Sequence, residues 1–233
     1  MNSLKFIAGA AAAIALSACA SAAPAKSYIA SAHLDATKFL AKPPEATSDA
    51  QKADMAVVKA DQAMKDTPRW DLAKHDDETS VYSAFGSALG ESFTKAKTPK
   101  LAALFDTLFA DVKTITDPSK VAFDRPRPPL IDTSITPCMP LEKSKSYPSG
   151  HATRGWMMAL MLSDMIPEKA NELLARGRDY GDSRIVCAEH YPSDVQAGRL
   201  IGAAVFAAAK DNAAFKHDYA AARWQTRRAL GLH

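Results

Sequence analysis

Apolar residues recur every three or four positions through most of this chain, which is the spacing of one face of an α-helix. One such run begins after Ser48, a residue type that often caps a helix, and stops at Pro68. No stretch shows the alternation of Val, Ile and Thr with hairpin turns that strands require. We therefore expect an all-α fold, a single-domain helical bundle. Further helices are predicted from Pro68 past Ala73 and over residues 81–93, 101–115, 152–166, 167–180, 192–209 and 211–228.

Two of these predicted helices, at 152–166 and 192–209, are apolar on nearly every side. A helix of this kind has to be surrounded by protein. We therefore expect these two helices at the centre of the bundle. Ser149 precedes the first of them and is its predicted N-cap.

Proline and glycine residues mark the predicted connections. Residues 124–140 are interrupted by prolines and are predicted to form a loop, which carries Arg127. Arg125 also precedes a proline, so residue type alone leaves open which arginine enters a binding site. Gly181 is expected to end the helix before it, which would place Arg184 on a connecting segment.

The first residues have the layout of a secretory signal peptide, predicted over residues 1–22. Lys5 is followed by an apolar run from Phe6 to Ala18, and then by small residues. Two processing routes remain open. Cleavage near 18/19 would leave Cys19 as a lipidated first residue, whereas cleavage near 22/23 would give a soluble form. Because both routes export the protein, we expect a periplasmic location, with an outer-membrane lipid anchor in the first case.

Two parts follow the signal peptide. Residues 23–47 are rich in Ala, Pro and Lys and are predicted to be an extended N-terminal arm, whereas residues 48–233 form the helical domain. That length suits one core rather than two. The formal net charge of +3 includes Lys5, so the exported chain is only mildly basic and implies no nucleic-acid partner. No other apolar run approaches the roughly 20 residues that a membrane-spanning helix needs.

One acidic run lies outside the apolar pattern. It extends from His75 to Glu78 and contains residue types that can bind a metal ion. Charge runs of this spacing are more often a solvated helix face, and that is the interpretation we expect here.

Residue types suited to phosphate chemistry gather between residues 120 and 194. Cationic side chains can hold an anion, and a Ser-Gly pair at a helix start offers hydroxyl and N–H donors. One histidine can attack phosphorus while another protonates the leaving group. Asp194 can also reach back to a ring nitrogen of His190 and fix its tautomer. In chain order the residues are Lys120, Arg127, Ser149, Gly150, His151, Arg184, His190 and Asp194.

The order and spacing of these residues resemble the signature of the phosphatidic acid phosphatase and vanadium haloperoxidase superfamily. Tyr147 before the Pro-Ser-Gly-His stretch, the modest length and the export signal make the chain look most like a bacterial class A nonspecific acid phosphatase. The motif spans about a third of the chain. It reads Lys120, six residues, Arg127-Pro128; then Pro148-Ser149-Gly150-His151; then Ser183-Arg184, five residues, His190, three residues, Asp194.

The resemblance implies a role for each residue. His190 would be the nucleophile that forms a phosphohistidine, Asp194 would orient it, and His151 would be the general acid. The substrates would be small-molecule phosphate monoesters, hydrolysed without a metal or cofactor at helix N-termini and connecting loops. We expect an acidic pH optimum, because His151 must carry a proton; the oligomeric state stays open, although homodimers are common in such families. The phosphoryl oxygens would be held by Lys120, Arg127, Ser149, Gly150 and Arg184.

Two other functions fit the same anion pocket. A vanadate-dependent haloperoxidase would bind vanadate and peroxide there, and a non-catalytic phosphate-binding protein of the envelope would bind phosphate alone. The second alternative leaves His151 and His190 without a purpose. Halide oxidation with vanadate and turnover of a phosphate ester separate the three functions.

Cys138 and Cys187 are the two cysteines outside the signal region. In an oxidising compartment, an even pair usually forms a disulfide. Such a bond would join the proline-rich loop to the segment between Arg184 and His190. Two buried free thiols are the alternative.

Overall fold

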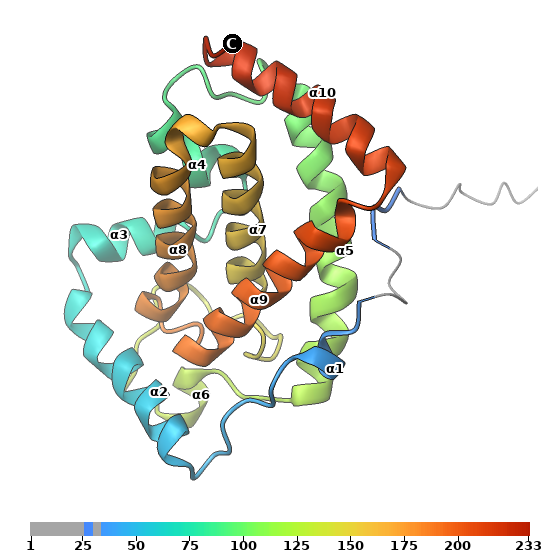
Figure 1. The fold of residues 1–233 in the computed structure, drawn as a ribbon. Helices are drawn as coiled ribbons and strands as arrows, with labels where there is room; N and C mark the ends of the chain where they lie inside the picture. The colour runs from blue at the N-terminus through green and yellow to red at the C-terminus, as the bar shows by residue number, and fades with distance from the viewer. Residues whose placement is uncertain (1–25, 30–33) are drawn as a thin grey trace, which may run out of the picture.

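The computed structural model describes residues 26–29 and 34–233, and within these residues every regular element is helical (Figure 1). The prediction of an all-α fold is confirmed. The predicted signal peptide and Cys19 lie outside the described residues. The helices are α1 (Ala36–Phe39), α2 (Asp49–Asp61), α3 (Pro68–His75), α4 (Val81–Leu89), α5 (Pro99–Phe123), α6 (Pro128–Ile131), α7 (Gly150–Met165), α8 (Ala170–Val186), α9 (Pro192–Ala209) and α10 (Ala213–Ala229), with 3₁₀ turns at Gln62–Met64 and Pro167–Lys169.

The centre of the bundle is α7, which packs against both α8 and α9 (Figure 1). Its side chains Met157, Met158 and Leu162 are completely buried, as the lack of a polar face predicts. On α9, Ile201 and Val205 are also completely buried. The two apolar helices are therefore central, and α5 and α10 pack together along one side of them. No helix in the described part of the chain combines the length and apolarity needed to span a bilayer.

Two glycines on α9 allow it to approach α7 closely. A Cβ at Gly198 would lie 2.5 Å from the carbonyl oxygen of Ser149, and one at Gly202 would lie 2.5 Å from that of Thr153. Any larger residue would push the helices apart. This close approach brings together the first turns of both helices, where the Ser149 N–H donates to the Asp194 carbonyl oxygen at 3.0 Å.

The helix predicted over 101–115 is longer than expected. It runs as α5 from Pro99 to Phe123 and passes through Pro118, which removes one backbone N–H. The helix continues because its next turn is buried, with Ser119 and Lys120 inside the protein. The left-handed backbone of Asp124 ends it, at φ 49°. Lys120 consequently lies in the last turn of a helix.

The helix expected to end at Gly181 also continues, as α8, to Val186. Gly181 does not cap this helix; a Cβ there would lie 3.3 Å from Val195 and 3.5 Å from Ala152. The glycine is thus explained by close packing rather than by helix termination. The prediction that Arg184 lies on a connecting segment is wrong, since Arg184 belongs to the last turn of α8.

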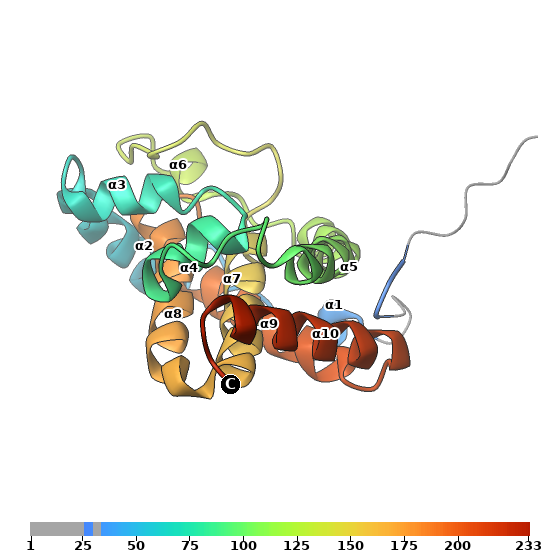
Figure 2. The same cartoon turned by 90° about the horizontal axis from the view of Figure 1, so that it is seen from above.

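The segment 124–140 is a loop, as predicted, except for the single turn of α6. Pro128 and Pro129 occupy the first positions of that turn, where no N–H is needed for a helical hydrogen bond. The chain between α6 and α7 then arches beyond the helices on one side of the molecule (Figure 2).

Part of the predicted N-terminal arm packs onto the domain. The Tyr28 N–H donates to Asp111 on α5 at 2.8 Å, and the Tyr28 hydroxyl donates to Asp218 on α10 at 2.6 Å. Leu40 is buried just after the single turn of α1. The described part of the arm therefore contributes to the core along α5 and α10.

Cys138 and Cys187 are joined by a disulfide, as predicted. Their Cα atoms lie 4.8 Å apart, and the Cys138 N–H also donates to the Cys187 carbonyl oxygen at 3.2 Å. The bond fixes the loop after α6 to the C-terminal end of α8.

Reducing this disulfide is expected to lower the free energy of unfolding by about 4 kcal/mol, because a closed loop restricts the unfolded chain. The sequence separation is 49 residues. For a domain of this size, the melting temperature should fall by on the order of 10 °C. Thermal unfolding of the exported protein with and without reductant measures this. The double variant Cys138→Ser, Cys187→Ser should have the melting temperature of the reduced protein, and reductant should not change it. Two titratable thiols in denatured, unreduced protein would contradict the bond.

Candidate active site

The site lies where the last turns of α5 and α8 meet the first turns of α7 and α9, beside α6, at the lower end of Figure 1. The structure brings together all the residues that the sequence motif singled out. Their side chains, although polar or charged, are withdrawn from solvent. The buried ones are Lys120, Arg127, Ser149, His151, Arg184, His190 and Asp194.

His190 is held between a carboxylate and a guanidinium. Its Nδ1 lies 3.4 Å from Asp194 Oδ2, and its Nε2 lies 3.3 Å from Arg127 Nη1. Asp194 is itself fixed, because Oδ2 accepts from the Ser146 hydroxyl at 2.5 Å and from the Tyr191 N–H at 2.9 Å. Burial, followed by the charges of Arg127 and Lys120, holds the pKa of His190 well below its usual value. The imidazole is therefore neutral at ordinary pH.

Arg127 is surrounded by oxygen acceptors. It donates from Nη1 to Glu189 Oε2 at 2.8 Å and from Nη2 to Glu142 Oε2 at 2.9 Å. Its Nε donates to the Ser144 carbonyl oxygen at 2.9 Å. Lys120 lies nearby, where burial and then Arg127 lower its pKa to about 8.

Free donors face the same region from α7 and α8. Arg184 Nη2 pairs with Asp77 Oδ1 at 2.9 Å, but its Nε and Nη1 are buried without a hydrogen-bond partner among the described residues. Ser149 is the N-cap of α7, as predicted, and its hydroxyl accepts from the Ala152 N–H at 3.2 Å. Gly150 begins that helix, and a Cβ there would meet only Arg154, at 3.9 Å. This helix start is open to an anion.

The His151 imidazole is neutral rather than positively charged in this arrangement. Its Nε2 lies 3.1 Å from the Asp77 carbonyl oxygen and 3.8 Å from the Asp77 carboxylate. Burial, followed by the charges of Arg184 and Arg154, lowers the pKa of His151 to about 3. The sequence-based expectation of a protonated His151 is therefore met only if an incoming anion raises this pKa.

The acidic run His75–Glu78 is not a solvated helix face, so that prediction was wrong. α3 ends at His75, and Asp76 is 1% exposed. Asp76 pairs with Arg176 and accepts from the Ser183 hydroxyl at 2.6 Å, which fixes the last turn of α8. Asp77 reaches Arg184 instead. The local charge pattern could not reveal the arginine partners of Asp76 and Asp77, because these arginines lie about a hundred residues further along the sequence.

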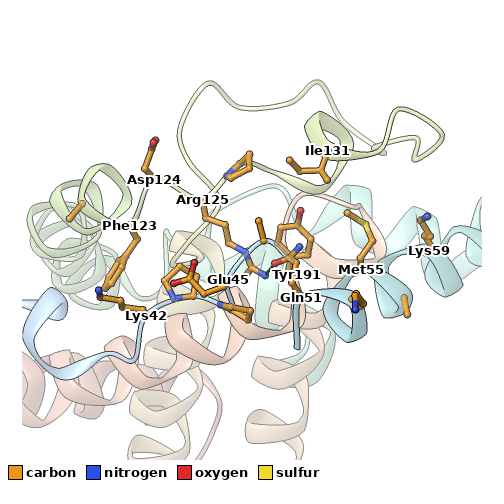
Figure 3. Close-up of a pocket in the computed structure, with 17 residues that line it drawn as sticks. Lys42, Glu45, Gln51, Met55, Lys59, Phe123, Asp124, Arg125, Ile131 and Tyr191 are labelled. Atoms are coloured by element: carbon orange, nitrogen blue, oxygen red, sulfur yellow. Dashed lines mark hydrogen bonds between the residues drawn. The ribbon is translucent and has the colours of Figure 1, made fainter. Parts of the chain in front are cut away.

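The two candidate arginines face different directions. Arg127 enters the site, as the spacing from Lys120 indicates. Arg125 instead contacts the carboxylate oxygen of Asp194 that does not face His190. Arg125 donates to Asp194 Oδ1 at 2.5 Å and to Asp54 Oδ2 at 2.7 Å. Its guanidinium carbon lies 3.9 Å above the Tyr191 ring. Figure 3 shows Arg125 and Tyr191 in the wall of a cavity of about 800 Å³.

That cavity is distinct from the anion site. It is bounded by α2, the end of α5 and the arm around Lys42, with Glu45 and Phe123 in its lining. None of the eight motif residues lines it. Arg125, in the lining of this cavity, is joined to the anion site by its ion pair with Asp194.

Comparison with known proteins gives matches over most of the chain. Residues 101–216 match the model of the PAP2 superfamily. An acid phosphatase of Zymomonas mobilis is 35% identical over 205 residues, 84% of this chain and 77% of that protein. A non-specific acid phosphatase of Salmonella typhimurium is 34% identical over 79% of this chain and 77% of its own length. A non-specific acid phosphatase of Providencia stuartii is 31% identical over 78% of this chain and 77% of its own length.

Among solved structures, a bacterial vanadium-dependent iodoperoxidase superposes with a TM-score of 0.60. The match covers 76% of this chain and 53% of the other, at 14% sequence identity. At that identity the likeness concerns the helical fold alone.

Proposed function

This chain belongs to the PAP2 superfamily, and from that premise we propose that it hydrolyses phosphate monoesters through a phosphohistidine, without a metal ion. Its relatives are acid phosphatases, and this chain is an enzyme of the same type. One observation carries the proposed mechanism: neutral His190 lies between Asp194 and Arg127, beside donors of Arg184 that have no partner in the described structure.

In the first step, His190 Nε2 attacks phosphorus and the bond to the ester oxygen breaks. Asp194 accepts a hydrogen bond from the Nδ1–H of His190 and stabilises the imidazolium that forms. Charge on the phosphoryl oxygens is met by Arg127, Arg184 and the N-terminus of α7, which are fixed before the reaction begins. This preorganised charge is why no metal is required in the proposal.

His151 is proposed as the proton donor to the leaving alcohol. A bound phosphoryl group brings negative charge close to the imidazole, which favours its protonated form. In the second step, water attacks phosphorus, its proton returns to His151, and the bond from His190 to phosphorus breaks. Phosphate is released and the enzyme is restored.

We also propose that the protein acts in the periplasm. The apolar segment after Lys5 supports export, and the disulfide suits an oxidising compartment. Attachment to the outer membrane through Cys19 and release as a soluble form both remain compatible with this proposal.

The direct test is turnover of p-nitrophenyl phosphate by the purified protein in excess EDTA. We expect hydrolysis to persist, because the proposed charge stabilisation comes from side chains. Loss of activity in EDTA that a divalent ion restores would overturn the metal-free mechanism. Halide oxidation with vanadate and peroxide, without ester turnover, would favour the haloperoxidase instead. Phosphate binding without either activity would favour a binding protein.

A further inference from the structure

Carboxylates already pair with both arginines of the anion site, although two donors of Arg184 have no partner among the described residues. Glu189 and Glu142 pair with Arg127, and Asp77 pairs with Arg184. A phosphoryl group that binds these arginines must therefore share them with carboxylates or replace them. Two negative groups on one desolvated guanidinium repel each other strongly.

Glu189 differs from the other two in its surroundings. It is 1% exposed and directly precedes His190, whereas the Glu142 side chain is 48% exposed. Only one of its oxygens is paired, because Oε1 is buried without a partner among the described residues. A buried carboxylate with an unpaired oxygen is costly while charged, and a proton removes most of that cost.

The charges around Glu189 come from several elements. Arg127 directly precedes α6, and Arg184 lies in the last turn of α8. Glu142 lies on the long loop between α6 and α7, and Asp77 follows α3. Burial raises the pKa of Glu189 to about 6, against the opposing effect of the two arginines. An added phosphoryl dianion would raise it further.

We propose that Glu189 takes up a proton when the phosphate ester binds, which releases Arg127 to the phosphoryl group and strengthens binding in acid. Glu189 is on this view a positioning residue that acts through Arg127. The inference rests on the proposed phosphate site, but it is independent of which histidine attacks. It gives a source for acid-favoured binding other than His151, whose pKa is lowered to about 3 by burial and then by Arg184 and Arg154.

Glu142 provides a matched control on the same arginine. Although its partial burial acts in the opposite direction, Arg127 holds the pKa of Glu142 at about 2. It therefore keeps its charge throughout the range in which Glu189 titrates. Removing the charge of Glu142 should strengthen anion binding at every pH, without changing the pH dependence.

Sulfate is a suitable probe, because it keeps its double charge from pH 6 to 7.5. Before sulfate binds, His151 and His190 are neutral in this window, and Lys120, with a pKa of about 8, is still mostly charged. Calorimetric titration in two buffers of different ionisation enthalpy gives both the affinity and the number of protons taken up. A bound anion also favours the protonated form of His151, so all the proteins compared carry His151→Ala. They are wild type at both glutamates (called wild type below), Glu189→Gln and Glu142→Gln.

For wild type we expect about one proton taken up per sulfate at pH 7, and an affinity that falls about tenfold for each pH unit above 6. Glu189→Gln should take up almost none and show a flat profile, and Glu142→Gln should keep the wild-type slope. Sulfate binding by wild type without proton uptake, or an unchanged slope in Glu189→Gln, would overturn the inference and leave the anion site standing. An absence of sulfate binding in all three proteins would overturn both.

Discussion

Replacing His190 with alanine should reduce turnover of phosphate monoesters by at least about a thousandfold while phosphate still binds. The substitution removes the proposed nucleophile but leaves the donors of Arg127 and Arg184 in place. Steady-state turnover of p-nitrophenyl phosphate gives the loss, and calorimetric titration with inorganic phosphate checks that the site survives. Activity within tenfold of wild type would eliminate His190 as the nucleophile.

His151→Ala is the matched control for this substitution, since it removes an imidazole from the same site without touching the nucleophile. Nitrophenolate leaves readily without a proton, whereas an alkoxide does not. We therefore expect a modest loss on nitrophenyl phosphate and a much larger one on an alkyl phosphate. Equal losses on both esters would argue against proton donation by His151.

The interior of the fold was predictable because its sequence signals are local. The apolar faces of α7 and α9 and the cap at Ser149 each depend on neighbouring residues. The helix ends at Phe123 and Val186 were not predictable in this way. Pro118 and Gly181 normally interrupt helices, but burial of the following turn stabilises the helical backbone in both cases, and burial depends on the tertiary fold.

In the candidate site, too, some features were predictable from the sequence and others depend on the tertiary fold. The spacing of the motif identified the residues that converge, but not the carboxylates that neutralise them. Asp77 and Glu142 lie in irregular segments without a periodic pattern, and their arginine partners come from other elements. Glu189 carried one signal in the sequence, its position next to His190. That signal was insufficient, since adjacency does not reveal whether a carboxylate is buried.

Arg125 is the residue for which the structure changes the expectation most. The spacing of the motif selects Arg127 and gives Arg125 no place in the anion site. In the structure Arg125 bridges Asp194 and Asp54, and all three side chains are buried or nearly so. Arg125 thus supports the carboxylate that orients His190.

Arg125→Ala should lower the free energy of unfolding by about 3–5 kcal/mol, because it leaves two carboxylates buried without their cation. The melting temperature should fall by on the order of 10 °C. Turnover should fall as well, since Asp194 would lose the contact that positions it. Urea unfolding and steady-state kinetics measure the two effects.

Lys59→Ala is the control for this prediction, because Lys59 lies at the same cavity (Figure 3) and also forms an ion pair. Its Nζ is 2.6 Å from Asp132 Oδ2, but the side chain of Lys59 is 52% exposed. Removing an exposed pair should change stability by less than about 1 kcal/mol and leave turnover unchanged. If Arg125→Ala were as mild as Lys59→Ala, the buried network would not support Asp194. Arg125→Lys should recover only part of the loss, because an ammonium group cannot match the fork geometry that reaches both carboxylates.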